Sequence, residues 1–354
     1  IRDRFRAPFN ALSEPETLLI PMNSDERLDQ LTAWIRQFEG FADARPLPAS
    51  GDASFRRYFR VQGSGSYILM DAPPPQEDCR PFVAIAGYLA SMGLNSPRVI
   101  EADLDRGFLL LTDLGSVQFL EELESNPGDA ERLYRDALDA LLVLQSGGAD
   151  FQDKLPPYDS RLLRFELSLF HDWLCEKHLG ITFSKSDEQH WQQCCDLLVT
   201  SALDQKQVFV HRDYHSRNLM VTKSENPGVL DFQDAVAGPL TYDLVSLLKD
   251  CYIKWPSDKI RDRAMYFYDR LPRDHGLDEA AFISRFDLMG VQRHLKAAGI
   301  FARLLHRDGK SGYLKDVPRT LTYIVDIASG YEQLGFLGKL IATRVLPPLK
   351  EAGQ

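Results

Sequence analysis

The sequence lacks the features that mark several large classes of protein. No apolar run approaches the roughly 18 residues that a membrane-spanning helix needs, so no membrane partner is expected. The five cysteines include no C-x-x-C pair, which predicts free thiols and no thiolate metal site. Acidic residues outnumber basic ones, 51 to 41, and this balance argues against nucleic acid as a partner. Nothing in the sequence calls for an obligate protein partner.

The first 21 residues also lack the apolar segment and the small-residue cleavage site of a secretory signal. Met22 follows them and resembles a natural start. We therefore expect residues 1–21 to be a flexible N-terminal extension and the protein to be cytoplasmic. At 354 residues the chain is too long for one compact core, which predicts two lobes.

The pattern of apolar residues changes near residue 113. Before it, a leading helix that Ser24 could cap precedes a helix over 81–92 and strand-like runs at 55–61, 67–70, 97–101 and 108–112. After it, helices are predicted near 129–145, 160–178, 187–203, 242–253, 257–270, 279–306 and 316–350, the last one broken. Three short strands are expected among them, near 207–211, 219–222 and 228–231. The sequence thus predicts an α+β protein with a smaller lobe over 22–113 and a larger one over 114–354.

Polar residues gather between two of the short strands, in the stretch VFVHRDYHSRNLMVT at 208–222. Phosphoryl transfer needs a carboxylate that orients the attacking hydroxyl, and oxygen ligands for Mg²⁺. Asp213 can supply the carboxylate, and Asn218 and Asp231 can supply the metal ligands. The Pro-Gly pair at 227–228 can turn the strands into a hairpin that brings Asn218 and Asp231 together. The stretch therefore predicts a phosphotransferase centre with Asp213 as its catalytic residue.

The same stretch carries a family resemblance. HRDYHSRN has the Asp-to-Asn spacing of protein-kinase catalytic loops and resembles the H-x-D-x-H-x-x-N loop of aminoglycoside-phosphotransferase-like small-molecule kinases. LDFQDAVAGPLTYDL resembles the downstream segment of that family, which puts Asp231 in the place of the metal-binding aspartate. The resemblance implies a two-lobed protein-kinase-like fold and an enzyme that uses ATP and Mg²⁺. It also implies that His211, His215 and Asp243 brace the loop.

The nucleotide side is less regular. ASGDASFRRYFRV lies where a phosphate-covering loop is expected, and the backbone of Gly51, Asp52, Ala53 and Ser54 could approach phosphate there. A plain hairpin turn is the alternative reading. LLLTDLG resembles the hinge of the family, so backbone groups of Leu111, Thr112 and Asp113 are expected to meet the adenine. Asp113 could instead cap a helix that begins near Ser116.

One residue of the kinase pattern is missing. The strand SYILMDAP holds no lysine for the α- and β-phosphates, and Leu69 and Met70 stand at the expected position. The helix over 81–92 likewise holds no glutamate to pair with such a lysine. Another cation must take its place, and Arg56 or Arg57 is the candidate. Both could instead be ordinary surface arginines.

A basic stretch at 290–319, with seven Lys or Arg and two Asp, bears on the acceptor. Arg293, His294 or Lys296 could reach the cleft and bind an anionic or hydroxylated acceptor, although a solvated basic face is the simpler reading. Polycationic aminoglycosides would favour acidic residues here, so the local charge argues against them.

Three segments resemble a narrower group of enzymes. They are SYILMDAPPPQEDCRPF, VLDFQDAVAGPLTYDLVSLLKDCYIKWP and QRHLKAAGIFARL, and they are similar to bacterial anomeric kinases for N-acetylmuramate and N-acetylglucosamine. The resemblance implies transfer of the ATP γ-phosphoryl group to the C1 hydroxyl of the amino sugar, giving the α-1-phosphate, in cell-wall recycling. Two alternatives stay open: a kinase of another small alcohol, and a non-catalytic nucleotide-binding pseudokinase.

Overall fold

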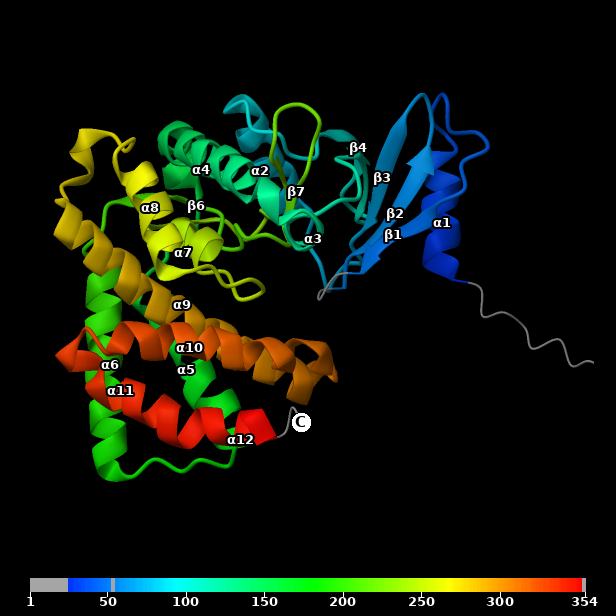
Figure 1. The fold of residues 1–354 in the computed structure, drawn as a ribbon. Coiled ribbons are helices and arrows are strands. Elements are labelled where there is room, and N and C mark those ends of the chain that lie inside the picture. Colours follow the sequence, from blue (N-terminus) through cyan, green and yellow to red (C-terminus); the bar gives the residue numbers. More distant parts are fainter. Residues whose placement is uncertain (1–24, 52–54, 352–354) are drawn as a thin grey trace, which may run out of the picture.

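A computed structural model describes residues 25–51 and 55–351 of the chain and divides them into a small lobe built on a sheet and a larger helical lobe (Figure 1). This arrangement confirms the α+β, protein-kinase-like fold that the sequence predicted. The expected extension at 1–21, and Ser24 with it, lie outside the described residues.

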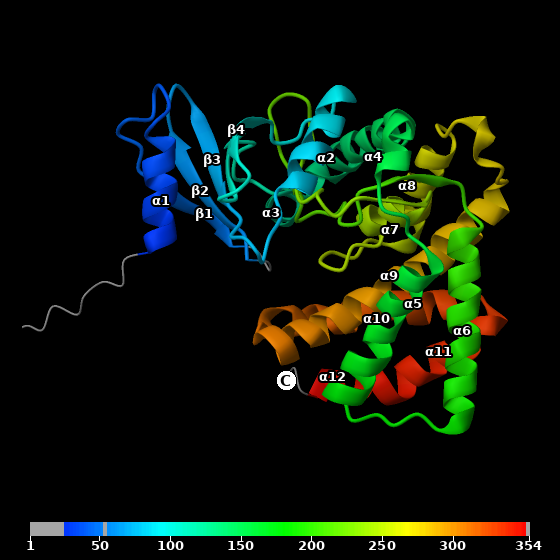
Figure 2. The ribbon, with the colours of Figure 1, turned by 180° about the vertical axis from the view of Figure 1, so that it is seen from behind.

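The small lobe is a five-stranded antiparallel sheet in the order β1-β2-β3-β5-β4. Its strands are β1 (Leu47–Gly51), β2 (Arg57–Gln62), β3 (Ser66–Asp71), β4 (Val99–Asp103) and β5 (Phe108–Thr112). The hairpin predicted between β2 and β3 forms, with Gln62 opposite Ser66. Helix α1 (Glu26–Ile35) covers the outer face of the sheet, and α2 (Arg80–Ser91) lies toward the helical lobe (Figures 1 and 2).

The two faces of this sheet have different partners. Because side chains alternate along a strand, β3 sends Leu69 to one face and Ile68 and Met70 to the other. Leu69 packs in a small apolar cluster with Leu31 and Trp34 of α1. Met70 belongs to the large core that continues into the helical lobe. The face that carries Ile68 and Met70 is therefore the one that looks toward the rest of the molecule.

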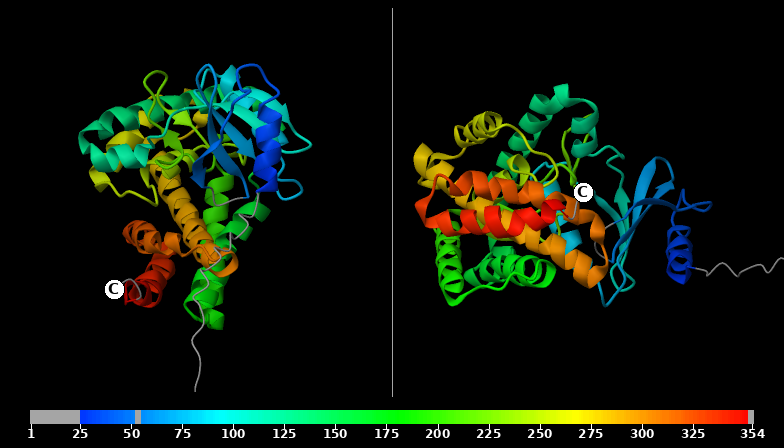
Figure 3. Two further views of the ribbon diagram at one scale, coloured as in Figure 1. Left: turned by 90° about the vertical axis from the view of Figure 1, so that its right-hand side faces the viewer. Right: turned by 60° about the horizontal axis from the view of Figure 1, so that its bottom comes forward.

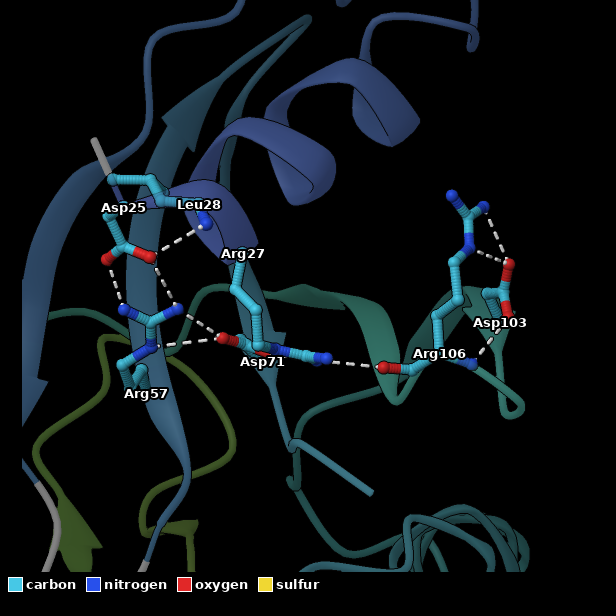
Figure 4. Close-up of polar contacts among 7 residues, drawn as sticks. All are labelled: Asp25, Arg27, Leu28, Arg57, Asp71, Asp103 and Arg106. Atoms are coloured by element: carbon cyan, nitrogen blue, oxygen red, sulfur yellow. Dashed lines mark hydrogen bonds and ion pairs between the residues drawn. The ribbon is translucent and has the colours of Figure 1, made fainter. Parts of the chain in front are cut away.

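A buried carboxylate ties α1 to the sheet (Figure 4). Asp71, fully buried at the end of β3, accepts hydrogen bonds from Arg27 of α1 and from Arg57 of β2, which reaches it at 2.6 Å. Arg57 also pairs with Asp25, the residue that caps α1, and this hydrogen bond lowers the pKa of Asp25. Two guanidinium groups thus compensate a charge that burial alone would penalise.

The helical lobe is assembled around α9, a helix of 30 residues. Its helices are α3 (Phe119–Ser125), α4 (Ala130–Gly147), α5 (Ser160–Leu169), α6 (Lys185–Leu203), α7 (Tyr242–Leu248), α8 (Ser257–Tyr268), α9 (Glu279–Asp308), α10 (Val317–Ala328), α11 (Gly335–Leu340) and α12 (Leu346–Glu351). Helices α10 to α12 form a layer along one side of α9 (Figure 3). Helix α5 lies against α9 as well and continues as π-helical turns over Phe170–His178. There α9 approaches so closely that a Cβ on Gly299 would lie 2.3 Å from the carbonyl carbon of Leu169.

Short strands within the helical lobe hold the loop that the sequence singled out. Strand β6 (Gln207–Val210) leads into it and pairs with β9 (Val236–Pro239). Strand β7 (Leu219–Met220) leaves it and forms the predicted hairpin with β8 (Gly228–Val229). Residues 211–218 are thereby fixed at both ends by backbone pairing.

The structure corrects some of the predicted helices and strands and confirms the prediction for the cysteines. Strands β1 and β9 were not predicted, and α7 ends at Leu248 instead of continuing to 253. The five cysteines are all buried and free, as expected. None of the helices in the described part of the chain has the length and apolar character needed to cross a membrane.

Candidate active site

The cleft between the lobes contains most of the predicted site. Its walls come from the inner face of the sheet, from the connection over 111–116, from the loop after β6 and from α9. Asp213, Asn218 and Asp231 all line it. Residues from two stretches of sequence, the loop over 211–218 and the segment after β8, therefore meet in one cavity, as the spacing of the motif suggested.

The backbone of the loop over 211–218 is held by buried carboxylates. Asp243 accepts the backbone N–H groups of His211 at 2.6 Å and Arg212 at 2.9 Å, and Arg212 adopts a positive φ of 79°. Burial raises the pKa of Asp243 to about 7. Asp250 accepts both the N–H and the hydroxyl of Ser216 further along the loop. A strained conformation that is fixed by several partners is typical of active sites.

The two predicted brace histidines have different positions. His211 is fully buried, accepts the Asp213 N–H at Nδ1 over 3.3 Å, and has its pKa lowered to about 4 by burial. His215 lines the cleft beside the ring of Tyr252, and its Nδ1 is buried with no hydrogen-bond partner in the described chain. His211 therefore makes a contact that fits a brace. Near His215, the contacts that hold the loop come from Asp250, which binds Ser216.

Asp213 is a half-buried carboxylate in a cationic environment. Burial alone would raise its pKa, but Lys296, His215 and Arg293 outweigh that effect and lower it to about 2. The group is consequently ionised at neutral pH. An ionised carboxylate can accept a hydrogen bond from an alcohol and orient it, which is the role that phosphoryl transfer asks of this residue.

The Asp231 carboxylate, a predicted metal ligand, is contacted by nitrogen atoms of neighbouring side chains. Its Oδ2 accepts from Asn218 Nδ2 at 3.3 Å, and its Oδ1 accepts from Gln233 Nε2 at 2.9 Å and lies 3.5 Å from Arg56 Nη2. Asn218 Nδ2 also donates to the Asp213 carbonyl at 3.0 Å. Asp231 has a positive φ of 61°, a conformation that residues other than glycine seldom adopt. The carboxylate and amide oxygens present here are the donor types that Mg²⁺ prefers.

The two candidate cations of the nucleotide side lie on opposite faces of the sheet. Arg56, just before β2, is near Asp231 and lies 3.9 Å from Glu77, with only 10% of its side chain exposed. Arg57 faces α1 and pairs with Asp25 and Asp71, so the possibility that it binds phosphate is corrected. Of the proposed phosphate-covering loop, Gly51 ends β1 opposite Arg57. Asp52, Ala53 and Ser54 lie outside the described residues.

The expected hinge is partly engaged by other contacts. Leu111 lines the cleft together with Ile68, Pro97 and Met220, which makes an apolar slot. Thr112 donates its N–H to the Arg98 carbonyl at 3.0 Å, so this N–H is not available to a base.

Asp113 does not cap a helix, because α3 begins at Phe119. Its carboxylate accepts from Arg60, Ser66 and the Gly115 N–H. It therefore fastens the hinge to β2 and β3.

Helix α9 presents two of its three predicted acceptor residues to the cleft. Arg293 and Lys296 line it, whereas His294 does not. The His294 ring stacks on Tyr323 at 4.7 Å, and its Nε2 contacts the Lys249 carbonyl at 2.7 Å. Consecutive residues of a helix point about 100° apart, so a residue next to a cleft-facing one turns away. The prediction that His294 binds the acceptor is therefore corrected.

Sequence reasoning missed one buried charge in the site. Glu166 of α5 accepts from Arg212 at 2.5 Å and pairs with Lys296 at 3.0 Å. Burial would raise the pKa of Glu166, but Lys296 and Arg212 lower it, so it is ionised. The sequence did hold a signal for this residue, because Glu166 follows Leu163 by three positions and so lies on the apolar face of the helix. It fixes two cations, Lys296 and Arg212, that help to lower the pKa of Asp213.

Arg217 of the loop over 211–218 was missed as well. It lines the cleft, and its guanidinium lies over the rings of Tyr252 and Tyr313. No periodicity points to it, because it belongs to an irregular loop.

Comparisons with known proteins identify the family of the chain. Residues 46–281 match the Phosphotransferase enzyme family. The chain is 47% identical over 347 residues to a protein named N-acetylmuramate/N-acetylglucosamine kinase from Pseudomonas aeruginosa, covering 94% of this chain and 100% of that protein. It is 39% identical over 329 residues to a protein of the same name from Neisseria meningitidis, covering 90% and 96%.

Solved structures show the same fold at low identity. The choline kinase LicA from Streptococcus pneumoniae aligns with a TM-score of 0.60 at 10% identity, covering 86% of this chain and 99% of that one. The gentamicin complex of APH(2")-IIa aligns with a TM-score of 0.57 at 13% identity, covering 84% and 95%. Because two thirds of its length matches one family model, and relatives at 47% and 39% identity align over most of it, the chain belongs to the Phosphotransferase enzyme family.

Proposed function

We propose that this protein is a cytoplasmic ATP-dependent sugar kinase that phosphorylates the anomeric C1 hydroxyl of N-acetylmuramate, N-acetylglucosamine or both. The product is the α-1-phosphate, formed during recycling of the cell wall. The meeting of Asp213, Asn218 and Asp231 in one cleft carries the proposal, and the named relatives at 47% and 39% identity support the choice of sugar.

Asp213 orients the acceptor hydroxyl. With a pKa of about 2 it is a weak base, so its contribution lies in holding the hydroxyl in line and in taking the proton late in the transfer. Lys296 and Arg293 keep it ionised, and Glu166 holds Lys296 in place. The cations around Asp213 therefore determine its charge state and do not react themselves.

Asn218 and Asp231 would hold Mg²⁺. When bound, the ion neutralises charge on the phosphates and thereby favours transfer. For this the Asn218 amide must present its oxygen in place of the Nδ2 that now donates to Asp231. The Asp231 carboxylate is the stronger ligand of the two because it is negatively charged, and the donors from Gln233 and Arg56 contact its Oδ1.

Arg56 takes the role of the missing strand lysine. On β3, Ile68 lines the cleft, and Met70 on the same face is buried in the core. Neither carries a charge, so β3 cannot supply a cation to the phosphates. Arg56 lies beside Asp231, a residue that would hold the metal, and could therefore contribute positive charge to the phosphates. Glu77 accepts the Phe55 N–H at 3.1 Å and approaches Arg56, which positions the arginine as a glutamate positions the lysine in other kinases.

The charge of the acceptor side supports a sugar over an aminoglycoside. Arg217, Arg293 and Lys296 line that part of the cleft, and only Lys296 has a buried carboxylate partner among the described residues. A polycation would be repelled by this lining, whereas a neutral or anionic sugar would not.

An acceptor panel tests the proposal. Purified protein with Mg-ATP is given N-acetylmuramate, N-acetylglucosamine, glucose, choline and an aminoglycoside, and ADP release is followed. The amino sugars should react fastest, and ³¹P NMR of the product should show coupling to the anomeric proton. Faster turnover of choline or the aminoglycoside, or phosphorus coupled to another ring position, would overturn it.

A further inference from the structure

The acceptor side of the cleft has an aromatic wall that no other part of the proposed mechanism uses. Tyr252, Phe301 and Tyr313 all line the cleft. The Phe301 and Tyr313 rings are stacked with centroids 5.7 Å apart, and Tyr252 lies 6.3 Å from Phe301. Flat aromatic faces of this kind suit the apolar face of a sugar ring.

Arg217 lies against this wall. Its guanidinium carbon is 4.7 Å from the centroid of Tyr252 and 5.8 Å from that of Tyr313. It belongs to the same loop as Asp213 and directly precedes Asn218. Among the described residues no carboxylate lies within ion-pair distance of it, in contrast to Arg212 and Lys296, which share Glu166. Two rings therefore hold a planar cation at the acceptor side while its hydrogen-bonding edge has no protein carboxylate to bind.

We propose that Arg217 binds the carboxylate of an acceptor that carries a lactyl group, and that it thereby sets the preference for N-acetylmuramate over N-acetylglucosamine. This inference rests on the proposed function. The two sugars differ in the lactyl ether on C3, close to the C1 hydroxyl that Asp213 would orient. A guanidinium fork matches a carboxylate with two parallel hydrogen bonds, and N-acetylglucosamine has no carboxylate for that fork.

The other two cations of the acceptor side are poorer candidates for this selectivity. Lys296 donates to the Tyr242 hydroxyl at 2.8 Å and pairs with Glu166. Arg293 is 5% exposed, and its Nη1 contacts the Cys251 sulfur at 3.7 Å. Both also set the charge state of Asp213. Their loss would therefore slow the reaction of either sugar, whereas the loss of Arg217 should discriminate between them.

The test compares Arg217→Met with the wild-type protein on both sugars. Methionine keeps the packing on the rings and removes the fork. The ratio of kcat/KM for N-acetylmuramate to that for N-acetylglucosamine should fall by about 10- to 100-fold, the range expected for a lost charge-assisted pair. Arg307→Met, an exposed arginine of α9 outside the cleft, is the matched control and should leave the ratio unchanged. Arg217→Lys should restore only part of the ratio, because an ammonium cannot form the bidentate pair.

A modified substrate makes the test independent of the fold of the variant. The methyl ester of N-acetylmuramate should be a poor acceptor for the wild-type protein, and Arg217→Met should no longer distinguish ester from acid. An equal fall for both sugars in Arg217→Met, or a wild-type protein that accepts ester and acid alike, would overturn the inference while the sugar-kinase proposal stands. A wild-type protein that phosphorylates neither sugar would overturn the proposed function itself.

Discussion

Replacement of Arg56 by methionine should weaken the use of ATP, while the same change at Arg57 should not. The two residues are neighbours in sequence, yet Arg56 lies beside Asp231 in the cleft and Arg57 lies on the other face of the sheet with Asp71. A charge-assisted hydrogen bond contributes about 1.5–3 kcal/mol. Its loss in Arg56→Met should lower kcat/KM for ATP by roughly 10- to 150-fold, since about 1.4 kcal/mol corresponds to a factor of ten.

Arg57→Met should instead lower stability. It leaves Asp71 with Arg27 as its remaining guanidinium partner in the described chain. Because 37% of the Arg57 side chain is exposed, solvent screens part of the interaction, and the cost should be about 1–2 kcal/mol. Urea unfolding measures this cost.

Initial-rate kinetics at saturating acceptor, run on both variants, separate the two effects. The assignment of Arg56 to the phosphates would be refuted by an Arg56→Met protein with wild-type kcat/KM for ATP. The assignment would also be refuted if Arg57→Met lowered kcat/KM for ATP as much as Arg56→Met does.

Two further substitutions test the charges of the site and its surroundings. Burial lowers the pKa of His294 to about 3. As the pH falls from about 6.5 toward 3, the unfolded chain therefore binds a proton at this histidine and the folded chain does not. The free energy of unfolding should decrease over that window by up to about 1.4 kcal/mol per pH unit. His294→Gln can keep the contact with the Lys249 carbonyl without titrating, so its unfolding free energy should vary less steeply between pH 6.5 and 4.5; equal slopes would contradict the assignment. Glu166→Gln leaves Arg212 and Lys296 without their carboxylate, so kcat should fall by about 10-fold or more while the Kd for ATP changes by less than about 3-fold. A wild-type kcat in that variant would argue against Glu166 as a positioning residue.

The periodicity of apolar residues predicted most of the helices and strands, because it reflects the conformation of the segment that carries it. The helices and the sheet strands with alternating apolar residues were found close to their true bounds. Strands β1 and β9 were missed because LPASG and VAGP are short and carry glycine and proline, which disfavour strands in a sequence read alone. Their strand conformation depends on partners elsewhere in the chain, since β9 pairs with β6 across nearly thirty residues.

The candidate site was predictable where chemistry imposes a spacing. The loop that carries Asp213 and Asn218 and the hairpin that carries Asp231 are such cases, and all three side chains line one cleft. The site residues outside the motif were less predictable, because their roles depend on which way a side chain points. Arg56 and Arg57 alternate across a strand, and Arg293 and His294 turn apart on a helix.

The convergence of Asp213, Asn218 and Asp231 is the central claim, and Asp213→Ala tests it most directly. The measurement is the rate of N-acetylmuramate phosphorylation at saturating Mg-ATP, with the Kd for Mg-ATP measured on the same protein. The rate should fall by about 10²- to 10⁴-fold while Mg-ATP still binds, because the residue that orients the acceptor is lost and the nucleotide side is intact. An Asp213→Ala protein that phosphorylates the sugar at the wild-type rate would contradict the account.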